Sequence, residues 1–270
     1  MGPARIVIAG AGIQSPGQVT IETERALRKS GVIYHLLSLT PAMRRYLWGL
    51  GPPLINLAPL YRDGALDQDV YEFIASFVVS SALRHRWLTL LVPGHPLVYA
   101  TPTALIQDQG RKLGVEVVVL PGISSLDTMV LQLGLDIADH GVQIYESNRF
   151  VYYRNEPDPR VPLFLMQPGG FGTGIITRGQ TSMPRRFREL ARALRATYPA
   201  RHRCCLVTSS IERGRADCLR WFPLRDLERM APHIDYHATL YIPPSEPSRE
   251  RRAAFASKLS NHRHAKALVR

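Results

Sequence analysis

The first half of the chain alternates short apolar runs with amphipathic segments. The runs "RIVIAG", "WLTLLV" and "VEVVVL" are continuous and rich in branched aliphatic residues, which is typical of strands buried on both faces. Between these runs, apolar positions recur at helical spacing, most clearly over residues 67–84. Buried strands separated by helices predict an α/β fold with a mostly parallel sheet covered on both faces.

Helix start signals support this interpretation. Thr20 precedes a helical segment that runs to Lys29, and Glu22 and Glu24 lie in its first turn, where the helix dipole favours acids. The segments "TPAMRRYLWGLG" and "TPTALIQDQGRKLG" both begin with Thr-Pro, and proline is favoured in the first turn of a helix. Each of these helices follows a predicted strand.

In the second half the predicted strands are shorter and alternate less regularly with helices. They are "GVQIYES", "VPLFLMQ", "CCLVTSS" and "ATLYIPP". A helix with a basic outer face is predicted over residues 184–196, and residues 150–160 are predicted to be a loop. These features predict a second α/β domain with a mixed sheet. We expect an N-terminal α/β domain at 1–120, a C-terminal α/β domain at 121–246 and a basic tail at 247–270.

Composition narrows the class of protein. The 270 residues are 45% hydrophobic and 21% charged, which indicates a globular chain, and no apolar run approaches the roughly 20 residues that span a bilayer. Three cysteines (Cys204, Cys205 and Cys218) form no C-x-x-C pair. Cys204 and Cys205 lie in an apolar run that predicts buried packing. Together the three cysteines predict no metal site and a reducing, cytoplasmic compartment.

The net charge of +12 is concentrated in the tail. The tail contains seven basic residues and one acid, Glu250. The basic residues are Arg249, Arg251, Arg252, Lys258, Arg263, Lys266 and Arg270. Only Phe255 is available there to stack on a base. We therefore expect a solvated extension and no nucleic-acid or membrane partner.

The glycine loop after the first strand does not match a dinucleotide fingerprint. Gly10, Gly12 and Gly17 lie in "GAGIQSPGQ", but G-x-G-x-x-G requires glycine where Ser15 stands. The second strand, "VIYHLLS", has no acid at its end to hold a ribose. The loop is either a plain strand-to-helix turn or part of the wall of a cleft.

Seven segments, taken together and in order, resemble a known family. They are "GAGIQSPGQVTIE", "LYRDGALDQDVYEFI", "GHPLVYATPT", "LPGISSLD", "GVQIYES", "FLMQ" and "ATLYIPP", and they span residues 10–244. The chain resembles the tetrapyrrole-methylase superfamily of S-adenosylmethionine (SAM) methyltransferases. Within that superfamily it is most similar to the borosin branch, which methylates backbone amide nitrogens of peptides.

The resemblance implies that SAM binds in the cleft between the two domains. Glycine in the "PGHP" turn leaves room for a ligand against the main chain, and the flanking prolines stiffen the turn. The residues that the resemblance assigns to the cofactor are Pro93, Gly94, His95, Val98, Tyr99, Ser124, Ser125, Gln167, Thr239 and Tyr241. Ser124 and Ser125 also suit helix capping, and Gln167 and Tyr241 also suit packing.

For catalysis the resemblance implies two tyrosines, Tyr61 and Tyr71, that assist the amide. The chain departs from the family pattern at two positions: Asp67 stands where the family has an arginine, and Pro93 where it has a third tyrosine. Arg62, beside Tyr61, is the alternative source of a guanidinium.

Three functions remain open. The first is methylation of backbone amides in a peptide supplied in trans, because residues 245–270 are basic and do not resemble an apolar core peptide. The second is methylation of a small-molecule amine, hydroxyl or carboxylate, which the two departures favour. The third is a silent SAM-binding partner subunit.

The resemblance also implies a homodimer, for which Phe73, Phe77 and Val78 are expected as exposed apolar residues on the long helix.

Overall fold

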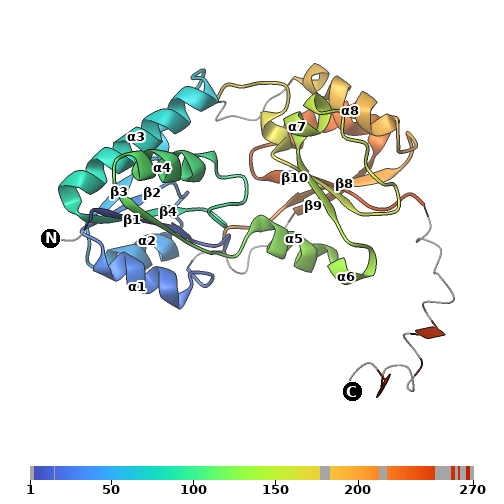
Figure 1. The fold of residues 1–270 in the computed structure, drawn as a ribbon. Coiled ribbons are helices and arrows are strands. Elements are labelled where there is room, and N and C mark those ends of the chain that lie inside the picture. Colours follow the sequence, from blue (N-terminus) through green and yellow to red (C-terminus); the bar gives the residue numbers. More distant parts are fainter. Residues whose placement is uncertain are drawn as a thin grey trace.

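The protein contains two five-stranded sheets that lie side by side (Figure 1). The computed structural model describes residues 3–14, 16–176, 183–212 and 218–246, together with 257–258, 261 and 266–267. Apart from those last five residues, the basic tail predicted at 247–270 lies outside the described residues. The predicted boundary at residue 120 remains a prediction, although the last strand of the first sheet ends there.

The first sheet is entirely parallel, with the strand order β3-β2-β4-β1-β5. Its strands are β1 (Arg5–Gly10), β2 (Val32–His35), β3 (Leu54–Asn56), β4 (Trp87–Val92) and β5 (Glu116–Leu120). The central strands β1 and β4 are buried along almost their whole length. This agrees with the continuous apolar runs in the sequence, because a parallel sheet is covered on both faces.

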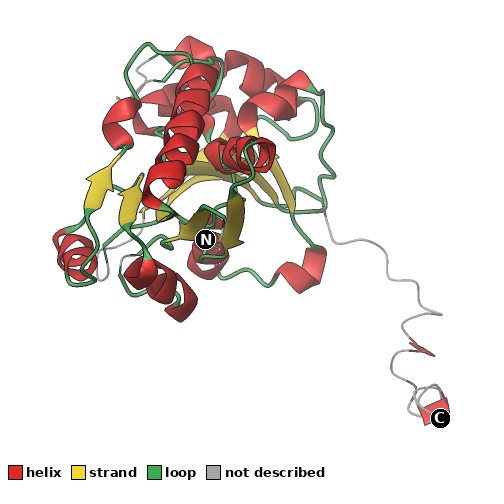
Figure 2. Ribbon diagram, turned by 60° about the vertical axis from the view of Figure 1, so that its left-hand side comes forward, coloured by secondary structure: helices red, strands yellow, loops and turns green. Residues whose placement is uncertain are grey.

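Helices cover both faces of this sheet (Figure 2). On one face α1 (Ile21–Lys29) and α2 (Pro41–Trp48) pack through Leu27 and Met43; on the other α3 (Asp67–His85) and α4 (Thr101–Lys112) pack through Ile74 and Ile106. The side chains of Thr20 and Thr40 accept hydrogen bonds from backbone N–H groups in the first turns of α1 and α2, so these two helix starts are confirmed. The second Thr-Pro start differs, because Thr101 is the first residue inside α4 and Ala100 precedes it without a side-chain cap.

The expectation that α3 exposes three apolar residues is wrong for Val78. Val78 is fully buried against the first sheet and Phe77 packs against the same core, whereas Phe73 is 54% exposed. The helix turns about 100° per residue, so Val78 falls on the face that Ile74 also occupies. The homodimer itself remains a prediction.

The second sheet is mixed, with the strand order β6-β7-β10-β8-β9. It contains β6 (Gln143–Glu146), β7 (Leu163–Met166), β8 (Arg203–Thr208), β9 (Cys218–Pro223) and β10 (Ala238–Ile242), and only β6 and β7 pair in parallel. Cys204 and Cys205 are fully buried in β8, as the apolar run predicts. The predicted fold class, a parallel sheet followed by a mixed one, is confirmed.

The second sheet is also covered on both faces. Met129 of α5 (Ser125–Leu133) packs on one face, and α7 (Ser147–Tyr152) and α8 (Arg188–Arg195) pack on the other. The short α6 (Ile137–His140) links α5 to β6, and 3₁₀ turns complete the order: η1 (Ala58–Leu60), η2 (Pro168–Gly170), η3 (Pro184–Phe187) and η4 (Leu224–His233). The loop expected at 150–160 therefore begins inside α7.

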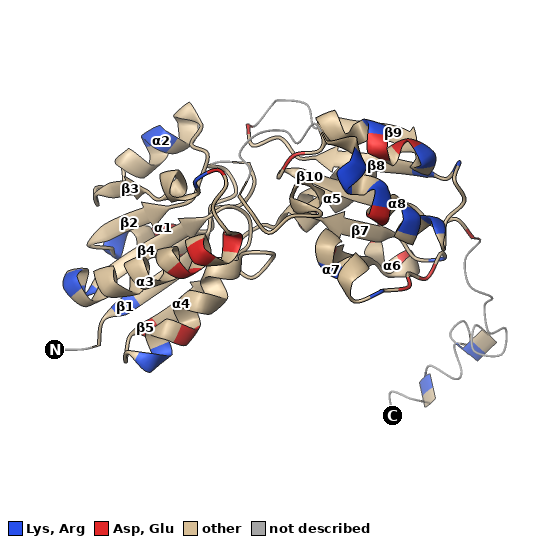
Figure 3. Ribbon diagram, turned by 90° about the horizontal axis from the view of Figure 1, so that it is seen from above, with Lys and Arg blue, Asp and Glu red and all other residues tan. Residues whose placement is uncertain are grey.

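The predicted basic helix corresponds to η3 and α8. Arg188, Arg192 and Arg195 are exposed on α8 while Leu190 and Leu194 are buried, and blue segments on the ribbon of that helix mark its basic residues in Figure 3. Among the described helices, none combines the length and the hydropathy that a membrane-spanning segment requires.

A short antiparallel contact ties the second half of the chain to the start of α3. Ile175 pairs with Leu66, and the Gly64 N–H donates to the Ile176 carbonyl at 2.9 Å. The Asp67 N–H donates to the Gly174 carbonyl, also at 2.9 Å. These bonds fix the segment that carries Tyr61 and Tyr71 against the second half.

Candidate functional site

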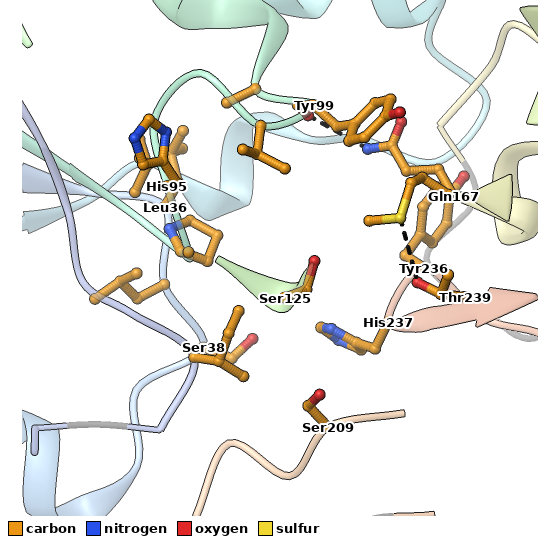
Figure 4. Close-up of a pocket in the computed structure, with 18 of the residues that line it drawn as sticks. Leu36, Ser38, His95, Tyr99, Ser125, Gln167, Ser209, Tyr236, His237 and Thr239 are labelled. Carbon is orange, nitrogen blue, oxygen red and sulfur yellow. Dashed lines mark hydrogen bonds between the residues drawn. The ribbon is translucent and has the colours of Figure 1, made fainter. Parts of the chain in front are cut away.

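A cavity of about 480 Å³ lies between the two sheets. The first sheet contributes the segments that follow the carboxyl ends of β1, β2 and β4, and the second contributes residues of β7, β8 and β10 (Figure 4). The strands β1 and β4 are neighbours, and the chain leads from β1 to β2 on one side of this pair and from β4 to β5 on the other. In open parallel sheets, ligands bind outside the carboxyl ends of strands at such a point, and the cavity has the size of a small-molecule site.

Three glycines bring the ends of the central strands together. A Cβ on Gly10 would lie 2.3 Å from the Gly94 carbonyl oxygen and 2.8 Å from the Gly122 Cα. A Cβ on Gly122 would lie 2.5 Å from the same carbonyl oxygen. The segments after β1, β4 and β5 therefore touch main chain to main chain, and only glycine permits this approach.

Hydrogen bonds stabilise the conformation of the "PGHP" turn. Gly94 has a φ of +68°, and its N–H donates to the Gly12 carbonyl at 2.9 Å. The Nδ1 atom of His95 accepts a hydrogen bond from the Leu97 N–H at 3.1 Å. Gly12 and Gly94 both line the cavity, so the loop after β1 is part of a cleft wall and not a plain turn.

Two non-glycine residues with positive φ, one from each half of the chain, meet in the wall of the cavity. Tyr99 has a φ of +55° and Gln167 a φ of +54°, and the Gln167 side chain donates to the Tyr99 carbonyl at 3.4 Å (Figure 4). Tyr99 belongs to the first half of the chain and Gln167 follows β7 of the second. Backbone strain of this kind concentrates at ligand sites, where surrounding structure maintains it.

The second half supplies an apolar wall with hydroxyl groups. Met129, Met166, Val207 and Ala238 line the cavity there. The Thr239 hydroxyl donates to the Met166 sulfur at 3.8 Å (Figure 4). The Ser209 hydroxyl accepts from the Gln132 amide at 2.8 Å.

Ten of the thirteen predicted site residues line this cavity. They are Tyr61, Tyr71, Pro93, Gly94, His95, Val98, Tyr99, Ser125, Gln167 and Thr239. Ser124 instead caps α5 in a reciprocal capping box with Asp127. Tyr241 is buried, with its ring centroid 5.1 Å from that of Phe164, and Arg62 is exposed. These three residues lie outside the lining.

Further residues line the cavity although the sequence did not predict them. Ser38 follows the carboxyl end of β2, and the parallel-sheet rule applied to the second strand points to it. Ser209, Tyr236 and His237 lie in irregular chain next to β8 and β10, and no motif distinguishes them. In Figure 4, Ser38, Ser125, Ser209 and His237 gather on one side, and Tyr99, Gln167 and Tyr236 on the other.

Tyr61 and Tyr71 form an edge-to-face pair with ring centroids 6.1 Å apart. Burial raises the pKa of Tyr71 to about 12, with a smaller contribution from Asp67, and burial also raises the pKa of Tyr61 strongly. Both phenols are therefore protonated at neutral pH. They can donate hydrogen bonds to an acceptor oxygen but are poor bases there.

The residues present suit SAM. Within the part of the chain that the structure describes, no Asp, Glu, Lys or Arg lines the cavity. Glycine backbone, hydroxyl groups and an apolar wall suit a nucleoside, and a Cβ-free turn at Gly94 leaves space beside the main chain. Among the described residues no cluster of three metal-ligating side chains occurs, and the expectation that no metal binds remains a prediction.

Comparison with known families gives one match over most of the chain. The family described as Tetrapyrrole (Corrin/Porphyrin) Methylases matches residues 5–211. Two crystal structures of uroporphyrin-III C-methyltransferase from Thermus thermophilus are similar. The first has a TM-score of 0.64 and 18% identity, and covers 89% of this chain and 94% of that one. The second, complexed with S-adenyl homocysteine, has a TM-score of 0.59 and 19% identity, covering 88% and 97%.

Curated relatives carry names that join a methyltransferase with a cyclic peptide precursor. A methyltransferase and ribosomally synthesized cyclic peptide precursor (gymnopeptides) from Gymnopus fusipes is 25% identical over 89% of this chain and 57% of its own length. A methyltransferase and type I borosin cyclic peptide precursor from Mycena rosella is 24% identical over 91% of this chain and 62% of its own length. The chain thus spans about 57 to 62% of the length of these relatives.

Proposed function

The chain belongs to the tetrapyrrole methylase family, whose members are SAM-dependent methyltransferases, and on that premise we propose that it methylates backbone amide nitrogens of a peptide supplied in trans. The observation that carries this proposal is the placement of Tyr61 and Tyr71 as a ring pair in the wall of the cavity that also contains the Gly94 turn. The curated relatives, named as precursors of cyclic peptides, support the choice of a peptide.

The first task of the chain is to hold the cofactor, which supplies an activated methyl group on a sulfonium. The Gly94 turn, Tyr99 and Gln167 would hold it from both halves of the chain, because all three line the cavity. Ser125 and Thr239 add hydroxyl groups on the wall of the second half. Contacts from both halves would orient the cofactor so that its methyl group faces a bound acceptor. Such orientation is the main contribution that an enzyme makes to a methyl transfer.

The second task is to prepare the acceptor. A backbone amide nitrogen is a weak nucleophile until its proton leaves to solvent water, which gives an imidate whose negative charge lies largely on the carbonyl oxygen. The protonated phenols of Tyr61 and Tyr71 are donors that would stabilise that oxygen. The raised pKa values argue against a tyrosinate base in this role.

A second candidate is methylation of a small-molecule amine, hydroxyl or carboxylate. Asp67, in the first turn of α3, and Pro93, in the cavity wall, favour it, because neither supplies the guanidinium or the phenol of the family pattern. Arg62 is exposed and outside the lining, so it does not replace the missing arginine. A catalytically silent SAM-binding subunit is the third candidate.

The test is mass spectrometry of reactions with SAM. A pool of blocked synthetic octapeptides and a parallel pool of small amines, alcohols and carboxylic acids are incubated with the protein, with S-adenosylhomocysteine as the inhibited control. We expect one added methyl group on a backbone fragment ion of a peptide. Methylation confined to a side chain or to the small molecules would replace the proposal with the second candidate, and no methylation in either pool would favour the third.

A further inference from the structure

The helix α4 begins in the wall of the cavity without a cap. Its N-cap and first three residues all line the cavity; they are Ala100, Thr101, Pro102 and Thr103. Ala100 has no side chain that can accept a hydrogen bond from the first turn, and no acid lies in that turn. The N–H groups at the start of this helix of 12 residues carry a partial positive charge. This part of the lining therefore favours an anion or an acceptor oxygen.

The hydroxyl group of Thr103 is a second feature of the same turn. The side chain is fully buried, and among the described residues its Oγ1 atom has no hydrogen-bond partner. A threonine inside a helix commonly donates to the carbonyl four residues earlier. Here that carbonyl belongs to Tyr99, and it accepts from the Gln167 side chain at 3.4 Å instead.

The other buried threonines show that this hydroxyl is an exception. In the described part of the chain, the five others all use their hydroxyl groups in hydrogen bonds; they are Thr23, Thr40, Thr89, Thr128 and Thr239. Buried polar groups in proteins are nearly always hydrogen-bonded, and an exception calls for an explanation. Because Thr103 lines the cavity, a ligand in the cavity is a natural partner for its hydroxyl.

Thr103 lies at the same level of the fold as Tyr71. The helices α3 and α4 pack side by side (Figure 1), and the Ser76 hydroxyl of α3 donates to the Gln109 side chain of α4 at 3.2 Å. Each helix connects two strands of the parallel sheet, so the two helices run in the same direction. Tyr71 is five residues before Ser76, and Thr103 is six residues before Gln109. The two residues are therefore at nearly the same height, and both line the cavity.

We propose that the N-terminus of α4 and the Thr103 hydroxyl bind the negatively charged oxygen of the acceptor substrate. The proposal rests on the function proposed above and adds a third donor to the two phenols. Two acceptors carry such an oxygen: a peptide amide as its imidate, and a small acid as its carboxylate. No Lys or Arg lines the cavity in the described part of the chain, so the helix end and the hydroxyl groups are what this lining offers to an anionic oxygen.

The test uses two probes of nearly equal shape, N-acetylvaline and N-acetylvalinamide. At neutral pH the first carries a carboxylate, which resembles an imidate in shape and charge, and the second carries a neutral amide. Both are titrated by NMR into protein saturated with S-adenosylhomocysteine, so the readout is binding and no methyl group is transferred. We expect the carboxylate to bind about tenfold more tightly, since charge-assisted hydrogen bonds are about twice as strong as neutral ones and the helix end favours an anion.

Three variants assign the effect to the hydroxyl group. Thr103→Val keeps the shape of the side chain and should weaken N-acetylvaline about tenfold and N-acetylvalinamide about threefold. Its melting temperature should not fall, because valine replaces a buried hydroxyl that has no partner in the free protein. Thr103→Ser keeps the hydroxyl and should bind N-acetylvaline nearly as tightly as the unchanged protein. Thr197→Val removes a hydroxyl outside the cavity lining and should change neither affinity.

Three results would overturn the inference. The first is equal affinity for the two probes, or no binding of either, which would leave a water molecule as the partner of the hydroxyl. This comparison needs no variant, so it decides the matter even where Thr103→Val does not fold. The second is undiminished binding of N-acetylvaline by Thr103→Val. The third is a loss of S-adenosylhomocysteine affinity in Thr103→Val as large as the loss for N-acetylvaline, which would assign the hydroxyl to the cofactor.

Methyl transfer distinguishes the two sources of the anionic oxygen. If a peptide is the acceptor, Thr103→Val should lower the rate at saturating peptide about tenfold and change KM less, because the imidate forms only on the way to the transfer. If methyl esters of carboxylic acids are the products, this inference stands and the peptide proposal fails. The probe comparison requires no turnover, so the two proposals fail separately.

Discussion

Replacing Gly10 by alanine is expected to lower the melting temperature by about 6 to 12 °C, which corresponds to about 3 kcal/mol, and to abolish tight binding of S-adenosylhomocysteine. The new Cβ would lie 2.3 Å from the Gly94 carbonyl oxygen and 2.8 Å from the Gly122 Cα. Both are backbone atoms, so no side chain can rotate away to relieve the contact. The Gly94 turn must move, and that turn lines the cavity.

Gly17→Ala is the matched control for this effect. Gly17 lies in the same loop after β1, and a Cβ there would meet nothing within 4 Å. Its melting temperature and its affinity for S-adenosylhomocysteine, measured by differential scanning and titration calorimetry, should match those of the unchanged protein. If Gly10→Ala bound the ligand as tightly as Gly17→Ala, the glycine contacts would not shape the cofactor site.

Tyr71→Phe is expected to lower turnover about a hundredfold while it changes the affinity for S-adenosylhomocysteine less than twofold. The substitution keeps the ring that packs edge-to-face on Tyr61 and removes only the hydroxyl donor. Loss of one donor to a developing oxyanion costs about two to three orders of magnitude in comparable sites. The measurement is single-turnover methyl transfer to the acceptor found by mass spectrometry, beside ligand titration.

Tyr152→Phe provides the control for Tyr71→Phe. Tyr152 is 75% exposed at the end of α7, outside the cavity lining, so the loss of its hydroxyl should leave turnover unchanged. Unchanged turnover in Tyr71→Phe would remove the proposed role of that phenol. A parallel loss of S-adenosylhomocysteine affinity would indicate that the hydroxyl supports cofactor binding instead.

The strands β1, β2 and β4 of the first sheet were predictable because they are buried almost throughout and their sequences are therefore mostly apolar. "WLTLLV" coincides with β4 at both ends. The strand β9 went undetected, since "CLRWFP" forms an edge strand whose first four residues are exposed and carry little apolar periodicity. The three residues of β3 are too few for any pattern to mark a strand.

The proposed cofactor-binding part of the cavity was easier to predict from the sequence than the proposed acceptor-binding part. Gly94 in "PGHP" indicates close backbone approach, whereas the sequence left the loop of Gly10 open as a plain turn or a cleft wall and did not mark Gly122. The structure brings all three glycines together. The positions of Tyr236 and His237 depend on how the second sheet faces the first, which no local pattern encodes. Val78 was misplaced because α3 is apolar on more than one face, with both Phe73 and Val78 on it.

Calorimetric titration of the protein with S-adenosylhomocysteine, followed by a thermal scan of the complex, tests the cofactor site most directly. The account predicts one bound molecule per chain and, at about a hundred times Kd, a rise in melting temperature of about 5 to 10 °C, because a ligand held from both halves stabilises the folded state. The Gly10→Ala protein should show neither. No heat of binding and an unchanged melting temperature in the unaltered protein would contradict a SAM site between the two sheets.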